Sequence, residues 1–422
     1  MAKLVMEGLH KLDGTVRIHG AKNSALPVLA ASLLPEGVSE IHNCPDLSDV
    51  NATVAILHYL GCRVERRDDC ITVDAAGLSH QEIPDCLMRE MRSSIVFLGA
   101  IIAKTGEAHM SFPGGCELGP RPIDLHLSAL SKLGVEIEEE RGYLHCRVKE
   151  PLHGAKITLA FPSVGATENI LLAAVTAKGT TVVLNAAREP EITDLCDYLN
   201  ACGARITGAG EGTLTIEGVQ KLHGCSHYVM PDRIETATYM AAAAVTGGVL
   251  QLKYTDIESA SPVFSVFEEA GCQLRTGRSE LIVQAPSRLR RITTVRTMPY
   301  PGFPTDAQAP VMAMACVANG TSVFIENIFE NRYKHVGELT RMGARIKVEG
   351  RVAVVEGVPL LFGAQVECTD LRGGAALVIA GLAADGITGI TGIHHLDRGY
   401  EALETSLARV GAVIRRENTA YS

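Results

Sequence analysis

The sequence contains no tryptophan, and aromatic residues make up only 5% of its 422 residues. The core must therefore be built mainly from Ala, Val, Leu and Ile. A hydrophobic fraction of 46% beside 21% charged residues is typical of a folded globular protein and excludes the disordered and fibrous classes. A chain of this length exceeds what one hydrophobic core usually serves, so we expect two or three domains.

Long apolar runs are also absent. The stretch ATYMAAAAVTGGVL, residues 237–250, is interrupted by glycine before it reaches the length of a membrane span. The N-terminus has neither an apolar segment nor the small-residue cleavage site of a secretory signal, so we expect a cytoplasmic protein. The net charge of −9 argues against general attraction to nucleic acid or membrane. A site for an anionic ligand would need cations concentrated locally.

The twelve cysteines lack CxxC pairs, and most stand singly in apolar patterns such as LGCRV and AGCQL. Neither a disulfide framework nor a zinc site is indicated, and we interpret most of these residues as small buried hydrophobes. Cys116 is the exception, because it lies among glycines and carboxylates in FPGGCELGPRPIDLHL, residues 112–127. Beside Arg121 and ahead of a helix, its thiol could act as a nucleophile or proton donor on a loop that opens and closes.

One pattern repeats six times along the chain. A helix end, a glycine and a strand recur as LHYLGCRVE, LSKLGVEIE, LNACGARIT, FEEAGCQLR, LTRMGARIK and LARVGAVIR. Glycine after a helix is the left-handed cap that turns the chain into a strand. The spacings between successive glycines are 73, 69, 68, 72 and 68 residues. The glycines are Gly61, Gly134, Gly203, Gly271, Gly343 and Gly411.

A helix that is apolar on almost every side precedes each of these patterns, as in ENILLAAVTAKGTTVVL, and such a helix must lie at the centre of a domain. Each unit therefore reads helix, strand, helix, strand, strand, and three units would form each of two domains. We expect residues 4–19 to complete the sheet of the last unit, and the chain to cross between domains near residue 21 and residues 227–232. A repeat scaffold for protein binding is the alternative, although its repeats usually run 20–50 residues.

Ionisable residues mark the starts of these helices. Cations are unfavourable at the positive end of a helix dipole unless an anion binds there, and helix N-termini beside Arg and Lys form phosphate or carboxylate sites. The residues at the starts of the buried helices are Lys22, Arg92, Arg233, Asp306 and Arg372, and the arginines before the second helices are Arg121, Arg188, Arg332 and Arg398.

Two interpretations of these residues stay open. An arginine could simply pair with an acidic neighbour, as Arg233 could with Asp232 or Glu235, and Arg398 could with Asp397. Asp306, in PGFPTDAQAP, is a candidate general base for a hydroxyl proton, and a helix cap is the competing interpretation.

Ten motifs occur in order along the chain: GAKNSALP, MRSSI, PGGCELGPRPIDLH, PSVGATEN, AAREPEI, PDRIETATY, FPTDAQAP, ENRYKHV, DLRGGAALV and HLDRGYE. With them the chain resembles the UDP-N-acetylglucosamine 1-carboxyvinyltransferase family, the enolpyruvyl transferases that open peptidoglycan synthesis, from its first residues to about Glu417. The resemblance implies a two-domain inside-out α/β barrel of the EPSP synthase-like fold, in which each domain has three βαβαββ repeats around buried helices. One domain would comprise residues 22–229 and the other residues 1–21 and 230–422, with the active site in the cleft between them.

The resemblance also implies the reaction. The enolpyruvyl group of phosphoenolpyruvate would move to the 3′-hydroxyl of UDP-N-acetylglucosamine, with release of phosphate through a tetrahedral intermediate and without metal or organic cofactor. Cys116 would protonate the methylene carbon or form a thioether adduct, and Asp306 would take or orient the hydroxyl proton. Lys22 and Arg398 would also serve catalysis.

The substrate contacts implied by the resemblance fall into two sets. Phosphoenolpyruvate would be bound by Lys22, Asn23, Arg121, Arg332, Arg372 and Arg398. UDP-N-acetylglucosamine would be bound by Arg92, Arg121, Pro122, Ile123, Asp124, Leu125, Ser163, Val164, Gly165, Thr305, Asp306 and Ile328.

One position departs from the family pattern. Some members carry a lysine two residues before the serine of the SVGAT motif, where this chain has Phe161, so only a backbone contact is expected there. Two alternatives to the transferase remain besides the scaffold. A 3-phosphoshikimate 1-carboxyvinyltransferase is disfavoured by Cys116 and the segment after it, and a non-catalytic paralogue is disfavoured by the intact set of Lys22, Asp306 and arginines.

Overall fold

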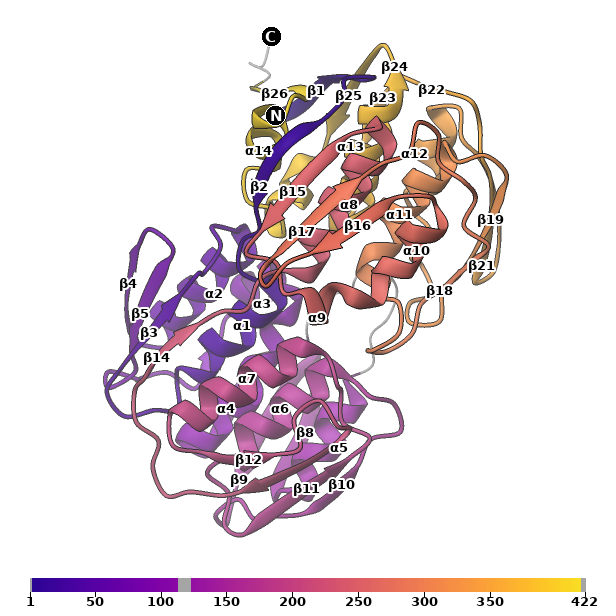
Figure 1. The fold of residues 1–422 in the computed structure, drawn as a ribbon. Helices are drawn as coiled ribbons and strands as arrows, with labels where there is room; N and C mark the ends of the chain where they lie inside the picture. The colour runs from indigo at the N-terminus through magenta and orange to yellow at the C-terminus, as the bar shows by residue number, and fades with distance from the viewer. Residues whose placement is uncertain (1, 113–122, 419–422) are drawn as a thin grey trace. The chain divides into compact units, whose positions relative to one another are not determined.

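The computed structural model describes residues 2–112 and 123–418, apart from the side chain of Arg92. Within these residues the chain forms two compact units (Figure 1). The first unit comprises residues 20–112 and 123–230, and the second unit comprises residues 2–19 and 231–418. The chain thus passes into the first unit after His19 and leaves it after Met230.

Six four-stranded sheets in the described residues share one pattern, three in each unit. An edge strand pairs parallel with the second strand, and the third and fourth strands follow antiparallel. The predicted six-fold repetition is therefore confirmed.

The three sheets of the first unit are, in spatial order, β14 (Ser226–Tyr228), β3 (Val38–His42), β5 (Cys70–Asp74) and β4 (Arg63–Arg67); β6 (Glu82–Ile83), β7 (Glu107–Ser111), β9 (Tyr143–Val148) and β8 (Val135–Glu140); and β10 (Lys156–Thr158), β11 (Thr180–Leu184), β13 (Thr213–Glu217) and β12 (Arg205–Thr207).

Those of the second unit are β2 (Asp13–Arg17), β15 (Val249–Lys253), β17 (Glu280–Gln284) and β16 (Gln273–Thr276); β18 (Thr294–Arg296), β19 (Thr321–Ile325), β21 (Val352–Glu356) and β20 (Arg345–Glu349); and β23 (Gln365–Glu367), β25 (Ile387–Thr391), β1 (Ala2–Glu7) and β26 (Val413–Asn418). A short parallel pair, β22 (Leu361–Phe362) with β24 (Ala384–Asp385), lies in the same unit.

Three nearly fully buried helices form the centre of each unit, and the sheets lie outside them, as Figure 1 shows for α8, α11 and α13. Because these helices meet protein on almost every side, they carry apolar residues at almost every position. The expected arrangement of sheets around buried helices is confirmed. The central helices are α1 (Lys22–Ala31), α4 (Phe97–Thr105) and α6 (Val164–Ala174) in the first unit, and α8 (Arg233–Thr246), α11 (Thr305–Cys316) and α13 (Leu371–Ala383) in the second.

The remaining helices lie toward the outside of each unit. In the first unit they are α2 (Ser48–Tyr59), α3 (Asp85–Glu90), the 3₁₀ helix η1 (Arg92–Val96), α5 (Asp124–Lys132) and α7 (Pro190–Ala201). In the second unit they are α9 (Ile257–Ala260), η2 (Ser261–Val263), α10 (Phe264–Glu269), α12 (Val336–Arg341), η3 (Ile393–Arg398) and α14 (Leu403–Arg409).

The six repeat glycines are the caps that the sequence predicts. Their φ angles lie between 94° and 108°, a region that favours glycine because it has no Cβ. After α2, for example, the N–H of Gly61 donates to the carbonyl of His58, and the N–H of Cys62 donates to that of Leu57. This pair of bonds ends the helix and directs the chain into β4.

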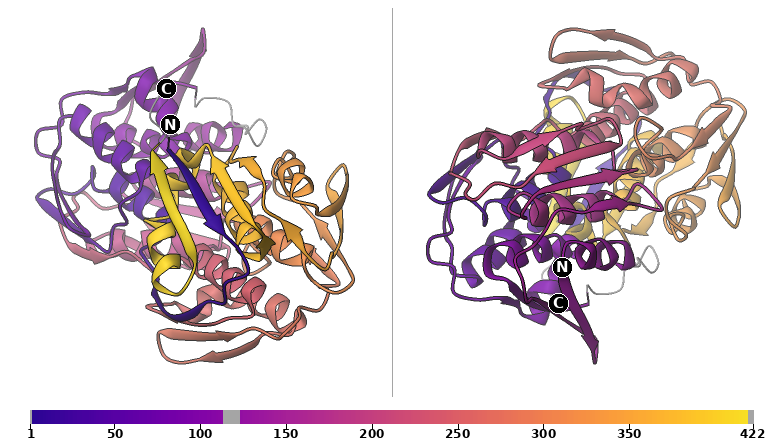
Figure 2. Two further views of the ribbon diagram at one scale, coloured as in Figure 1. Left: turned by 90° about the horizontal axis from the view of Figure 1, so that it is seen from above. Right: turned by 90° about the horizontal axis from the view of Figure 1, so that it is seen from below.

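The N-terminal segment differs from the prediction of a single strand over residues 4–19. β1 does join the last sheet, between β25 and β26, as predicted, and Figure 2 shows this indigo strand beside the yellow C-terminal ones. β2, however, pairs with β15 in another sheet of the same unit. The chain turns between them at Gly8, whose Cβ, if present, would lie 2.1 Å from the carbonyl oxygen of Ala384. Leu9 follows with a positive φ of 63°.

Eight of the cysteines that the structure describes are buried, two are half-buried, and Cys86 is exposed. The prediction of small buried hydrophobes is therefore confirmed for most of them. Cys116 lies outside the described residues. In the part of the chain that the structure covers, no helix combines the length and apolar character needed to cross a membrane.

Candidate active site

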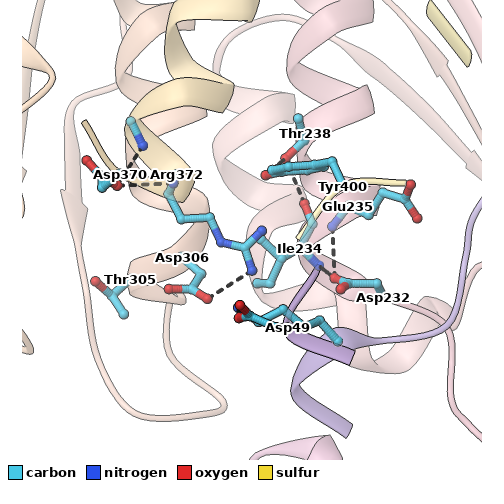
Figure 3. Close-up of polar contacts among 12 residues, drawn as sticks. Asp49, Asp232, Ile234, Glu235, Thr238, Thr305, Asp306, Asp370, Arg372 and Tyr400 are labelled. Atoms are coloured by element: carbon cyan, nitrogen blue, oxygen red, sulfur yellow. Dashed lines mark hydrogen bonds and ion pairs between the residues drawn. The ribbon is translucent and has the colours of Figure 1, made fainter. Parts of the chain in front are cut away.

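The carboxylate of Asp306 is held by two arginines of the second unit (Figure 3). Arg332 Nη2 donates to Asp306 Oδ1 at 2.8 Å, and Arg372 Nη2 donates to Asp306 Oδ2 at 3.1 Å. Each arginine side chain is 3% exposed, whereas that of Asp306 is 27% exposed. An accessible carboxylate is thus backed by two buried cations.

Asp306 is not a helix cap. The N-cap of α11 is Pro304, no side chain caps this helix, and the carboxylate of Asp306 bonds to the arginines instead. In contrast, Asp370 does cap α13, because its Oδ1 accepts from the backbone N–H groups of Arg372 and Gly373. The capping alternative for Asp306 was therefore wrong, and the role of a base stays a prediction.

Arg372 remains a cation despite its burial. Burial alone would lower its pKa, but the neighbouring Tyr400 and Asp306 outweigh burial and raise the pKa above the ordinary value. The guanidinium carbon lies 5.4 Å from the centre of the Tyr400 ring. Nε of Arg332, and Nε and Nη1 of Arg372, have no hydrogen-bond acceptor in the described protein. Such donors favour the approach of an anion such as a phosphate or carboxylate.

His335 is a residue of this cluster that the sequence analysis missed. Burial lowers the pKa of its imidazole well below the ordinary value, so the ring is neutral between Asp370 and Arg332. It packs on the first turn of α13, where a Cβ on Gly373 would lie 3.0 Å from its own Cβ. The available signal was its place three residues after Arg332 in ENRYKHV.

Thr305 and Ile328 are brought together by one buried carboxylate. Thr305 Oγ1 donates to Glu326 Oε2 at 3.0 Å, and the backbone N–H of Ile328 donates to Glu326 Oε1 at 2.8 Å. Glu326 is only 1% exposed and ends the strand β19. Sequence reasoning missed Glu326, although the residue begins the segment ENRYKHV's upstream neighbour ENIF.

Arg398 does not pair with Asp397. Asp397 instead receives two hydrogen bonds from Arg416, at 2.6 and 3.0 Å. Arg398 is half-buried at the end of η3. At α8, Asp232 caps the helix, Glu235 bonds to His19, and Arg233 lies 5.7 Å from the centre of the Tyr300 ring.

Lys22 occupies the start of α1 in the first unit, beside the half-buried Asn23. Its Nζ lies 2.7 Å from Oδ2 of Asp49, which stands in the first turn of α2. One turn further into the unit, the hydroxyl of Ser24 donates to Asp194. Asp49 and Asp194 are positioning carboxylates that the sequence analysis did not select.

Two predicted nucleotide-sugar segments meet in the first unit. Residues 123–125 open α5, and Ser163 caps α6, with its Oγ accepting from the N–H of Ala166 at 3.3 Å. His126 of α5 lies against this turn, since a Cβ on Gly165 would be 2.9 Å from its Cε1. Val164 and Gly165 form that first turn.

His126 also escaped the sequence analysis. Its Nδ1 accepts a hydrogen bond from Asn169 Nδ2 at 2.9 Å, and burial lowers its pKa to about 4. The neutral ring thereby fixes the N-terminus of α6 against α5. Nearby, Phe161 is 43% exposed, and its carbonyl accepts from the N–H of Ser163.

The structure therefore groups Thr305, Asp306, Ile328, Arg332 and Arg372 in the second unit, and residues 123–125 with residues 163–165 in the first. Cys116, Arg121 and Pro122 lie outside the described residues, and the side chain of Arg92, at the start of η1, is not described. Among the described residues, no group of three or more His, Cys, Asp or Glu side chains is arranged to hold a metal ion.

Comparison with known proteins decides the family. The sequence profile of EPSP synthase (3-phosphoshikimate 1-carboxyvinyltransferase) matches residues 6–407. The chain belongs to the EPSP synthase family. Within this family its repeat pattern, buried helices and helix-start cations have a common explanation as one inherited fold.

Curated members of the family are similar over nearly the whole chain. UDP-N-acetylglucosamine 1-carboxyvinyltransferase 2 of Caldanaerobacter subterraneus subsp. tengcongensis is 53% identical over 416 residues, which cover 99% of this chain and all of the relative. UDP-N-acetylglucosamine 1-carboxyvinyltransferase 1 of Symbiobacterium thermophilum is 50% identical, with 98% of this chain and 95% of the relative covered. The resemblance drawn from the motifs is confirmed, and the repeat-scaffold alternative was wrong.

Solved structures of the EPSP synthase family have the same fold. The enolpyruvyl transferase NikO from Streptomyces tendae matches with a TM-score of 0.90 at 26% identity and covers 99% of both chains. An EPSP synthase from Acinetobacter baumannii matches with a TM-score of 0.76 at 19% identity, over 99% of this chain and all of that one. The second likeness concerns the fold alone.

Proposed function

We propose that the protein transfers the enolpyruvyl group of phosphoenolpyruvate to the 3′-hydroxyl of UDP-N-acetylglucosamine and releases phosphate, the first committed step of peptidoglycan biosynthesis. The observation that carries the proposal is the accessible carboxylate of Asp306 between Arg332 and Arg372. The names of the relatives identify the acceptor, because they are UDP-N-acetylglucosamine 1-carboxyvinyltransferases at about half identity over the full chain.

The proposed chemistry is an addition followed by an elimination. The hydroxyl adds to the enol ether while a proton reaches the methylene carbon, and phosphate then leaves from the tetrahedral intermediate as the double bond reforms. The reaction needs a base for the alcohol, an acid for the carbon and cations for the departing phosphate. It needs neither a metal nor an organic cofactor.

Asp306 is our candidate for the base, and the two arginines behind it are candidates for the anion. In the structure their guanidinium groups bind Asp306 directly. We propose that the phosphate or carboxylate of phosphoenolpyruvate competes for these N–H groups, which leaves Asp306 able to accept the hydroxyl proton. Lys22, Asn23, Arg121 and Arg398 are proposed as further contacts of phosphoenolpyruvate.

Residues of the first unit are proposed to bind the nucleotide sugar. The N-terminus of α6, capped by Ser163, presents backbone N–H groups that suit a diphosphate. Thr305, Asp306 and Ile328 are proposed to contact the sugar, and Cys116 to deliver the proton to carbon or to form a thioether adduct. The remaining proposed contacts are Arg92, Arg121, Pro122, Ile123, Asp124, Leu125, Val164 and Gly165.

Phosphate release tests the proposal directly. The purified protein is incubated with phosphoenolpyruvate and either UDP-N-acetylglucosamine or shikimate 3-phosphate, and phosphate is measured over time. Release only with the nucleotide sugar is expected. Release only with shikimate 3-phosphate would assign the sister activity, and release with neither would support a non-catalytic paralogue.

A further inference from the structure

Two histidines face each other on the outer side of a sheet in the first unit, and the candidate active site uses neither. His109 of β7 and His145 of β9 are directly opposed in antiparallel register, with their Nδ1 atoms 2.7 Å apart. Ala108 and Met110, which alternate with His109 on β7, are buried, whereas the His109 side chain is 38% exposed. The pair is therefore open to solvent on a strand pair that is rigidly hydrogen-bonded.

The hydrogen bonds around the pair define where its protons lie. Nε2 of His109 lies 3.0 Å from Oε1 of Glu107, and since the carboxylate can only accept, this nitrogen carries a proton. In the neutral ring the Nδ1 of His109 then has a free lone pair. The proton shared with the second ring consequently belongs to Nδ1 of His145. One replaceable proton thus separates two imidazole nitrogens.

This arrangement has the features of a metal-binding pair. Histidines that bind metals usually donate their other ring N–H to a carboxylate, which fixes the tautomer and raises the basicity of the ligand. Glu107 makes that contact with His109. Two more carboxylates lie in register on the same row of the sheet, Glu82 opposite His109 and Glu138 opposite His145.

We infer that His109 and His145 bind one divalent transition-metal cation, such as Zn²⁺, through their Nδ1 atoms. Binding displaces the shared proton from His145 to solvent, and water with Glu82 or Glu138 completes the coordination. Zn–N bonds of about 2.0–2.1 Å in tetrahedral geometry place the two nitrogens roughly 3.4 Å apart. The rings must therefore separate slightly, which their exposure on the sheet surface permits.

The charge around the pair favours a cation. β8, which lies next to β9, carries Glu136 and residues 138–140, all of them acidic and exposed. Only Arg147 and Lys149 pair with this group, both through Glu136. The surface near Glu138 thus offers carboxylate oxygens to an ion held by the two imidazoles. The two histidines alone converge in the structure, so the carboxylates must turn toward the ion to join them.

Zinc titration by calorimetry of the full chain, freed of metal with a chelator and kept reduced, tests this inference. We expect one zinc per chain and release of a proton on binding. His109→Gln or His145→Gln should weaken binding at least about tenfold, and Glu107→Gln, which removes the partner of a ligand, about tenfold. His153→Gln is the matched control, because His153 is an exposed histidine of the same unit and should bind zinc like the wild type.

Circular dichroism shows whether each variant is folded before it is titrated. Cobalt spectra identify the ligands, because thiolate coordination adds charge-transfer absorption that imidazole coordination lacks. Zinc binding that persists in the double variant His109→Gln/His145→Gln would overturn the inference, as would thiolate bands in the wild type. Absence of saturable binding to the wild-type protein would overturn it as well.

Discussion

Lys22 and Asp49 form a buried ion pair in the first unit, with Nζ 2.7 Å from Oδ2 and side-chain exposures of 11% and 3%. The pair joins the first turn of α1 to that of α2, so it sets the position of a cation proposed to bind phosphoenolpyruvate. A buried charge that loses its partner is costly, whereas an exposed pair contributes little.

Asp49→Asn is therefore expected to destabilise the protein by about 3 kcal/mol, because it leaves the Lys22 charge buried without this partner. Urea unfolding measures the loss. Asp46→Asn is the matched control, since Asp46 is 66% exposed and lies 3.8 Å from Arg66. Equal stability of the two variants would show that the Lys22–Asp49 pair is not a stabilising contact.

Asp306→Asn should lower kcat by about 10²–10⁴-fold while changing KM little, because an amide cannot accept the hydroxyl proton. Steady-state kinetics with both substrates separate the two constants. Asp13→Asn, at an exposed position of β2, should behave like the wild type. A change confined to KM would assign Asp306 to binding alone.

Arg398→Ala is expected to raise KM for phosphoenolpyruvate more than KM for the nucleotide sugar, because the lost charge is proposed to contact the smaller anion. Arg416→Ala provides the control, since Arg416 pairs with the adjacent Asp397 and with Glu404 on the surface. Equal effects of Arg398→Ala on both substrates would contradict the proposed contact.

Cys116 should be the site at which a small thiol-directed epoxide such as fosfomycin inactivates the protein. Peptide mass spectrometry locates the label, and residual phosphate release measures the activity. Cys86→Ser is a suitable control, because Cys86 is an exposed thiol whose removal should not protect the enzyme. Full activity after complete alkylation of Cys116 would refute its catalytic role.

Glu168 of α6 links stability to pH. Burial, with Glu191 and Glu189 adding to it, raises the pKa of Glu168 to about 8 from the usual 4.5. The folded protein then binds more protons than the unfolded chain between these values, so this contribution is complete below about pH 4.5 and is lost as the pH rises through about 8.

Glu168→Gln should remove that loss, so the unfolding constant of the variant should change at least about tenfold less than that of the wild type between pH 5 and pH 8. Urea unfolding at the two pH values measures it. Glu217→Gln, at the exposed end of β13, should keep the wild-type dependence. The same dependence in Glu168→Gln would show that other groups cause it.

Local signals were sufficient for much of the fold. The six glycines predicted helix ends because a left-handed cap depends on residues within one turn, and each of them has the expected positive φ. The buried helices were recognisable because a helix surrounded by protein needs apolar residues on every face. The strand at residues 4–19 was divided incorrectly, because the close approach of Gly8 to Ala384 is a contact between distant parts of the chain.

The sequence by itself determined the repeat, the family and the identities of the charged residues at the helix starts. Only the tertiary structure decided their partners: Asp306 with two arginines, Asp397 with Arg416, Lys22 with Asp49, and Thr305 with Ile328 through Glu326. The physical reason is range. Caps and periodic apolar faces depend on neighbours along the chain, whereas an ion pair depends on which side chains the completed packing brings within about 4 Å of each other.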